Sequence, residues 1–136
     1  MVSDDELLAK AIAQLPLAYI PYSKFPVGAA LLCEDGTIIT GVNVENASYG
    51  GTICAERSAY VSAISQGKRK FKAIAVATEL VPFGAPCGLC RQFMVEFGNV
   101  KVILGNSKTN DKLITSISEL LPHSFGPESL DQHASQ

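Results

Sequence analysis

The chain has 136 residues, of which 47% are hydrophobic and 18% charged. This is the composition of one packed globular domain, and it excludes disordered, collagen-like and low-complexity classes. Eleven Lys and Arg residues against thirteen Asp and Glu residues give a net charge of -2, which provides no long-range attraction to polymeric nucleic acid or to an anionic membrane.

The first part of the chain predicts one helix and one β-hairpin. Ser3 and Glu6 form a capping-box pattern ahead of apolar residues at helical spacing, so we expect a helix that Pro16 ends or kinks. Two apolar, partly β-branched runs follow, 27–33 and 37–42, separated by a short acidic turn that ends in glycine. This pattern is typical of a hairpin.

The middle of the chain predicts a helix, a buried strand and a second helix. Apolar residues recur at helical spacing over 54–66, and an apolar run at 73–77 is typical of a short buried strand. A helix is expected over 87–97, with its inward face formed by Leu89, Phe93, Met94 and Phe97.

The C-terminal part predicts two strands and a capped helix. The apolar runs 100–104 and 113–115 are separated by about eight polar residues, too few for a crossover helix, so the two strands should be antiparallel. Ser116 begins a capped helix that ends before Pro122. Together the elements predict one α/β domain over residues 1–136, a mixed sheet with helices on both faces, and a flexible polar tail at 131–136.

Four cysteines define the functional question: Cys33, Cys54, Cys87 and Cys90. The first six residues are acidic, where a secretory leader would be basic, and no apolar run approaches the length of a membrane span, so we expect a cytoplasmic protein. In a reducing compartment these thiols are metal ligands, catalytic groups or small core residues rather than disulfides.

The spacing of three cysteines points to zinc. Cys87 and Cys90 form a C-x-x-C pair at the start of a helix, where the dipole stabilises thiolate, but such a pair alone fits a redox centre, half a zinc site or an incidental pair equally well. Cys54 also opens a helix. Three cysteine ligands with a fourth position left for water match a catalytic zinc site, whereas Cys33 lies within an apolar strand and is expected in the core.

Two residues beside Cys54 suit the chemistry of such a site. Glu56 is close enough to face a water at the metal without being a ligand, so it is a candidate proton shuttle. Arg57 is placed to donate hydrogen bonds to the thiolates and to offset their charge.

Several segments together resemble the small homotetrameric cytidine deaminases that act on free nucleosides. The general zinc-deaminase signature, in its three-cysteine variant, is found here as Cys54-Ala55-Glu56 and Pro86-Cys87-Gly88-Leu89-Cys90. The flanking segments that narrow the resemblance are PYSKFPVGAA at 21–30, NVENASY at 43–49 and ELLP at 119–122. The resemblance covers nearly the whole chain and implies a three-layer α/β/α fold with a five-stranded sheet.

The resemblance also implies a function and a set of site residues. One zinc ion per subunit would be held by Cys54, Cys87 and Cys90, and Glu56 would shuttle protons. The reaction would be the hydrolytic deamination of cytidine and 2'-deoxycytidine, with release of ammonia, in pyrimidine salvage. Substrate contacts would come from Phe25 on the base, Asn43 and Glu45 on the ribose, and in addition Ala55, Tyr49 and Phe125. Tyr49 and Phe125 would reach a neighbouring subunit's ligand, which places the sites at the interfaces of a homotetramer.

Three alternatives stay open on the sequence. A blasticidin S-type deaminase shares the zinc motif but, in our reading of its pattern, lacks the Phe25 segment and the pairing of Asn43-x-Glu45-Asn46 with Arg57. A non-catalytic domain would use Cys33 as the fourth ligand of a structural zinc, although structural sites usually show two close ligand pairs. A thiol-disulfide role for Cys87 and Cys90 is the third. A polynucleotide substrate is disfavoured because no basic groove is indicated.

Overall fold

The computed structural model describes residues 1–136 and contains one five-stranded mixed sheet. The strands lie in the order β2-β1-β3-β4-β5. Their bounds are β1 (Gly28–Cys33), β2 (Ile38–Val42), β3 (Phe71–Thr78), β4 (Lys101–Asn106) and β5 (Lys112–Ser116). Only β3 and β4 pair in parallel, while the other neighbours are antiparallel. The mixed sheet, the first hairpin and the antiparallel final pair are therefore confirmed.

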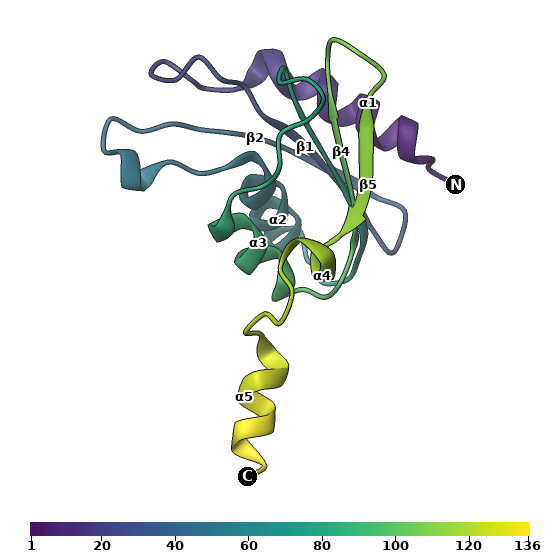
Figure 1. Ribbon diagram of the computed structural model, residues 1–136, viewed down its shortest axis with the longest axis vertical. Helices are drawn as coiled ribbons and strands as arrows, with labels where there is room; N and C mark the ends of the chain where they lie inside the picture. Colours follow the sequence, from purple (N-terminus) through teal and green to yellow (C-terminus); the bar gives the residue numbers. More distant parts are fainter.

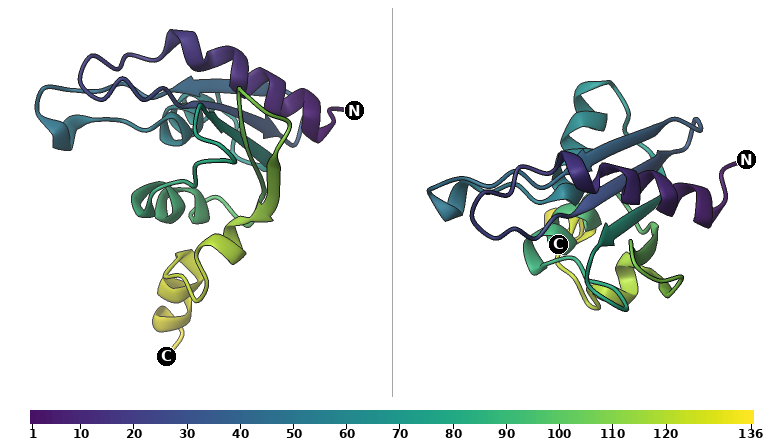
Figure 2. Two further views of the ribbon diagram at one scale, coloured as in Figure 1. Left: turned by 45° about the horizontal axis from the view of Figure 1, so that its top comes forward. Right: turned by 90° about the horizontal axis from the view of Figure 1, so that it is seen from above.

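Helices cover both faces of the sheet (Figures 1 and 2). Helix α1 (Asp4–Gln14) packs on one face, where it contacts all of the first four strands. On the other face α2 (Ala55–Ser65) packs on the sheet, α3 (Gly88–Val95) packs beside α2, and α4 (Ile117–Leu120) packs beside α3. Two separate apolar clusters, one under α1 and one under α2 to α4, form the core. The three-layer α/β/α prediction is thus confirmed.

The predicted end of the first helix is also confirmed. Ser3 and Glu6 form the capping box at the start of α1. At the other end Pro16 lies in a single 3-10 turn, η1 (Leu15–Leu17), because proline cannot donate the hydrogen bond that would continue an α-helix.

A glycine in β2 brings α2 into backbone contact with the sheet. A Cβ atom built on Gly41 would lie 2.5 Å from the amide nitrogen of Ala59 and 2.6 Å from the carbonyl oxygen of Ala55. Because only hydrogen fits there, the first two turns of α2 rest directly on β2. Cys54 is the N-cap residue of this helix, so the contact also sets the position of that thiol.

The inward face predicted for α3 is wrong at Leu89, whose side chain is 70% exposed. Cys90 and Met94, four residues apart, are fully buried and define the inward face instead. Phe93 and Phe97 are half-buried and join an aromatic cluster around Tyr60 of α2. Leu89 lies one position before this face, in the first turn of the helix, where no neighbouring element covers it.

The polar C-terminus forms a helix that the sequence pattern does not predict. Helix α5 (Pro127–Ala134) extends into the segment expected to be a flexible tail, and it projects from the body of the molecule (Figure 1). Proline at its first position and the hydrogen bond from the Gly126 amide to Ser129 Oγ, 3.3 Å, favour its start. None of its residues is buried. No helix in the structure is long and apolar enough to cross a membrane.

Candidate active site

Three thiols from two helix N-termini meet at one point. Cys54 caps α2, Cys87 caps α3, and Cys90 lies in the first turn of α3. Their sulfur atoms all lie within 4.8 Å of one another, and the Sγ atoms of Cys54 and Cys87 are 3.9 Å apart. Three thiolates held tetrahedrally at 2.3 Å from zinc would be separated by about 3.8 Å, so the cluster fits that ion. Cys33 is 1% exposed in the core under α2 and takes no part.

The surroundings of this cluster favour thiolate at Cys54. Hydrogen bonding from the Cys90 thiol, followed by the Arg57 guanidinium and the Cys87 thiol, lowers the pKa of Cys54 to about 5. Its thiolate and the burial of Cys90 in turn raise the pKa of the Cys90 thiol. Metal binding displaces protons from such thiols, so an anionic cluster at two positive helix ends is suited to a divalent cation.

Arg57 lies beside the thiol cluster. Its Nη2 donates a hydrogen bond to Cys54 Sγ at 3.5 Å, one turn along α2 from the cap position. That bond from Arg57 to the Cys54 sulfur raises the pKa of Arg57, so the guanidinium stays charged. A fixed positive charge beside three thiolates reduces the net negative charge of the centre.

We expect Arg57→Gln to weaken zinc binding about 10- to 100-fold, because the sulfur loses a charged donor. Competition with a chromogenic chelator measures this change. Arg69→Gln is the matched control, since its guanidinium donates to the carbonyl oxygens of Ile64 and Lys68, away from the thiols. Equal zinc affinity in Arg57→Gln and the wild type would contradict the support role.

Glu56 lies beside the cluster as a buried carboxyl group. It is 3% exposed and lines the same cavity as Cys54 and Cys87. Burial raises the pKa of Glu56 to about 7. A carboxyl group with a pKa near neutrality can both accept and return a proton, which is what general acid–base catalysis requires.

The cavity that Glu56 lines has a volume of about 320 Å³. Phe25 lines it with a half-exposed ring, together with Asn43 from the end of β2. The cavity therefore combines one aromatic face, a carboxyl group and two thiols, a composition that suits a small flat polar molecule. Seven lining residues were not predicted from the sequence: Val27, Thr52, Val76, Thr78, Leu80, Gly84 and Ala85.

Asn43 also makes hydrogen bonds to the backbone of the segment before β1. Its Oδ1 accepts from the amide of Val27 at 2.9 Å, and its Nδ2 donates to the carbonyl oxygen of Phe25 at 2.9 Å. Asn43 thus fastens the segment that carries the Phe25 ring. One Nδ2 hydrogen and one Oδ1 lone pair remain for a ligand.

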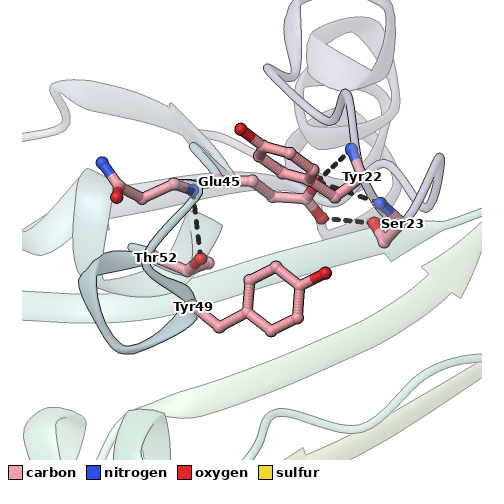
Figure 3. A pocket seen from close by; sticks show the side chains of 6 residues that line it. Tyr22, Ser23, Glu45, Tyr49 and Thr52 are labelled. Atoms are coloured by element: carbon pink, nitrogen blue, oxygen red, sulfur yellow. Dashed lines mark hydrogen bonds between the residues drawn. The ribbon is translucent and has the colours of Figure 1, made fainter.

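Glu45 lies in a neighbouring cavity of about 240 Å³, which shares Thr52 with the first (Figure 3). Its carboxylate accepts hydrogen bonds from the amides of Tyr22 and Ser23, at 3.0 and 3.1 Å, and from the Ser23 hydroxyl. The hydroxyl hydrogen bond is the main cause that lowers the pKa of Glu45. The single chain therefore does not place Glu45 in the same cavity as Glu56.

Like Glu45, three further predicted substrate contacts lie outside the cavity of Glu56. Tyr49 lines the neighbouring cavity with a side chain that is 76% exposed, in the 3-10 turn η2 (Tyr49–Gly51). Phe125 is 59% exposed, and Gln92 Nε2 donates to its carbonyl oxygen at 2.8 Å. Ala55 is fully buried at the start of α2 and does not line the cavity.

One sequence signal pointed toward the lining residues that were missed. Residues 79–86 come directly before the C-x-x-C pair, so this loop has to pass beside the thiols. The two strand residues, Val76 and Thr78, could not be assigned from sequence because which end of β3 faces the thiols depends on the sheet order.

Comparisons with known proteins agree with this geometry. Residues 1–106 match the family model described as the cytidine and deoxycytidylate deaminase zinc-binding region. The chain is 48% identical over 134 residues to the cytidine deaminase of Sporosarcina psychrophila, covering 97% of this chain and 98% of the relative. It is 51% identical over 120 residues to the probable cytidine deaminase of Dictyostelium discoideum, covering 88% and 81%.

A solved structure shares the fold over most of the chain. The 1.6 Å crystal structure of cytidine deaminase from Burkholderia pseudomallei superposes with a TM-score of 0.88 at 47% identity, covering 91% of this chain and 100% of the other. The family region includes all three clustered cysteines and Glu56. The chain therefore belongs to the family of zinc-binding cytidine and deoxycytidylate deaminases.

Proposed function

We propose that this protein hydrolyses cytidine and 2'-deoxycytidine to uridine and 2'-deoxyuridine, with release of ammonia. The observation that carries the proposal is a cluster of three thiols, of which Cys54 and Cys87 line one cavity together with the buried Glu56 and the Phe25 ring. The names of the relatives support the same reaction. A cytoplasmic location is part of the proposal and rests on four cysteines that are all free.

The reaction needs one proton carrier close to the base and to water. The oxygen of a water molecule bonds to C4 of the base while Glu56 accepts a proton from that water and delivers it to N3. Glu56 then transfers the second proton of the water to the amino group, the C4–N bond breaks, and ammonia leaves. Zinc, when held by Cys54, Cys87 and Cys90, acidifies water.

Substrate positioning follows from the remaining lining groups. The Phe25 ring offers an aromatic face to the pyrimidine, and Asn43 keeps one donor and one acceptor for a ribose hydroxyl. Glu45 has one of its roughly four lone-pair positions free for another hydroxyl. The neighbouring cavities share Thr52, which is consistent with base and sugar occupying one each.

The chain acts as a homotetramer in this proposal. Tyr49 and Phe125 are large, mostly exposed aromatic side chains that lie outside the cavity of Glu56, and each would reach the substrate of a neighbouring chain. Light scattering at a mass of four times 14.4 kDa supports the assembly, and a monomer mass in an active sample contradicts it.

Zinc removal gives the test of the proposed function. The zinc-loaded protein should convert cytidine with loss of its absorbance and release of ammonia. Treatment with a chelator should reduce the rate to background, and added Zn²⁺ should restore it, because the three thiols then regain the ion that activates water. Rates on blasticidin S, measured side by side with those on cytidine, test the alternative of a blasticidin S-type deaminase. A zinc-loaded sample that does not turn over cytidine would refute the proposal.

A further inference from the structure

Asn106 is a buried polar residue that the proposed reaction does not use. It ends β4 with an exposed fraction of 2%, and it pairs across the sheet with Thr78, the last residue of β3. A buried amide needs hydrogen-bond partners, because an unpaired one costs free energy. The partners of Asn106 lie in two different loops.

One side of the amide organises the turn after β4. Asn106 Oδ1 accepts from the backbone amides of Lys108 and Thr109, at 2.8 and 2.7 Å, and Nδ2 donates to Thr109 Oγ1 at 2.9 Å. Asparagine commonly stabilises turns through such bonds to its own backbone. This half of the interaction explains local structure only.

The other side reaches the cavity wall. Asn106 Nδ2 donates to the carbonyl oxygen of Pro82 at 2.6 Å. Pro82 lies in the middle of segment 79–86, which connects β3 with α3 and contributes Leu80, Gly84 and Ala85 to the lining of the cavity that holds Glu56. Asn106 therefore contacts the segment that forms the cavity wall without lining the cavity itself.

Segment 79–86 has few other attachments. Near its start the Leu80 amide donates to Thr78 Oγ1 at 3.0 Å, and at its end Arg91 Nε donates to the Pro86 carbonyl oxygen at 2.8 Å. Gly84 packs on Thr78, since a Cβ atom there would lie 3.2 Å from Thr78 Cγ2. Between those two ends, the bond from Asn106 is the one hydrogen bond that holds the segment.

We propose that Asn106 is a positioning residue that holds the 79–86 wall against the substrate cavity and thereby sets the affinity for the nucleoside. The proposal rests on the proposed function for its choice of substrate. The zinc ligands are anchored separately, because Cys87 and Cys90 belong to α3 and Arg91 fixes Pro86 beside them. Loss of the hydrogen bond from Asn106 to Pro82 should thus affect substrate binding more than zinc binding.

Asn106→Asp tests this separation. Its carboxylate keeps the acceptors for the Lys108 and Thr109 amides but cannot donate to Pro82. We expect the KM for cytidine to rise about tenfold, with kcat changed less than about twofold and zinc content unchanged. Hydrogen–deuterium exchange in peptides covering 79–86 should become faster.

Thr109→Val is the matched control, because it removes the hydroxyl partner on the turn side and leaves the bond to Pro82. It should leave KM and the exchange of 79–86 as in the wild type.

If Asn106→Asp does not fold, Asn106→Ser replaces it, since a serine hydroxyl still supports the turn and is too short to reach Pro82. Wild-type KM and exchange in a folded Asn106 variant, or equal changes in Thr109→Val, would overturn the proposal. If the wild type does not turn over cytidine, the proposed function fails. Hydrogen–deuterium exchange in 79–86 then still shows whether Asn106 holds this segment.

Discussion

Replacing Glu56 by glutamine should lower kcat for cytidine by about 10²- to 10⁴-fold, the usual contribution of a positioned acid–base group. The amide has nearly the shape of the carboxyl group but cannot accept a proton from water or return one to the base. Because Glu56 is not part of the thiol cluster, the variant should keep its zinc. A stopped assay for uridine, with metal analysis on the same sample, measures both quantities.

Glu96→Gln provides the comparison for this substitution. Glu96 is an exposed glutamate at the C-terminal end of α3, outside the lining of the cavity, so its variant should retain the wild-type rate. Near-normal turnover in zinc-loaded Glu56→Gln would show that another group carries the protons. Loss of zinc together with activity would instead assign Glu56 a structural part in the metal site.

Gly41→Ala should damage both the fold and the site, although Gly41 lines no part of the cavity. The new methyl group would lie 2.5 to 2.6 Å from backbone atoms of Ala59 and Ala55, well inside van der Waals contact, and backbone cannot rotate away as a side chain can. We expect a loss of about 3 kcal/mol in the free energy of unfolding and a fall in Tm of roughly 10 °C. A displacement of α2 carries Cys54 and Glu56 with it, so kcat should fall about 10²-fold.

Gly50→Ala separates this steric effect from the general effect of losing a glycine. No atom lies within 4 Å of a Cβ built on Gly50, so its variant should melt at or slightly above the wild-type temperature. Thermal melts followed by circular dichroism compare the two variants. A Gly41→Ala protein with wild-type Tm and kcat would mean that α2 is not seated through this contact.

The sequence predicted most of the fold because its signals are local. The capping box at Ser3, the hairpin runs and the cysteines that open α2 and α3 each specify structure through neighbours within a few residues. The predicted burial of Leu89 was wrong because periodicity identifies a helix face without showing where the neighbouring element ends. Helix α5 was missed because its residues are mostly polar and none is buried, which leaves no apolar pattern to detect.

The site was predictable where chemistry alone selects the residues. Three cysteines and a glutamate have few other purposes at that spacing, and the structure brings them together. Contacts between distant segments were not predictable. Asn43 holds the backbone of Phe25 eighteen residues away, and Asn106 holds Pro82 at a separation of 24 residues. Such bonds depend on how the strands are ordered in the sheet.

The separation of Cys54 and Cys87 by 33 residues makes the thiol cluster a cross-link as well as a site. Gathering these thiols closes a loop that contains α2, β3 and segment 79–86, and closing a loop of this length in an unfolded chain costs on the order of 3 to 4 kcal/mol of entropy. In the folded chain this loop is already closed, so zinc binds the folded chain far more tightly than the unfolded chain. Metal occupancy and foldedness are therefore thermodynamically linked, and the free zinc concentration sets part of the stability of the native state.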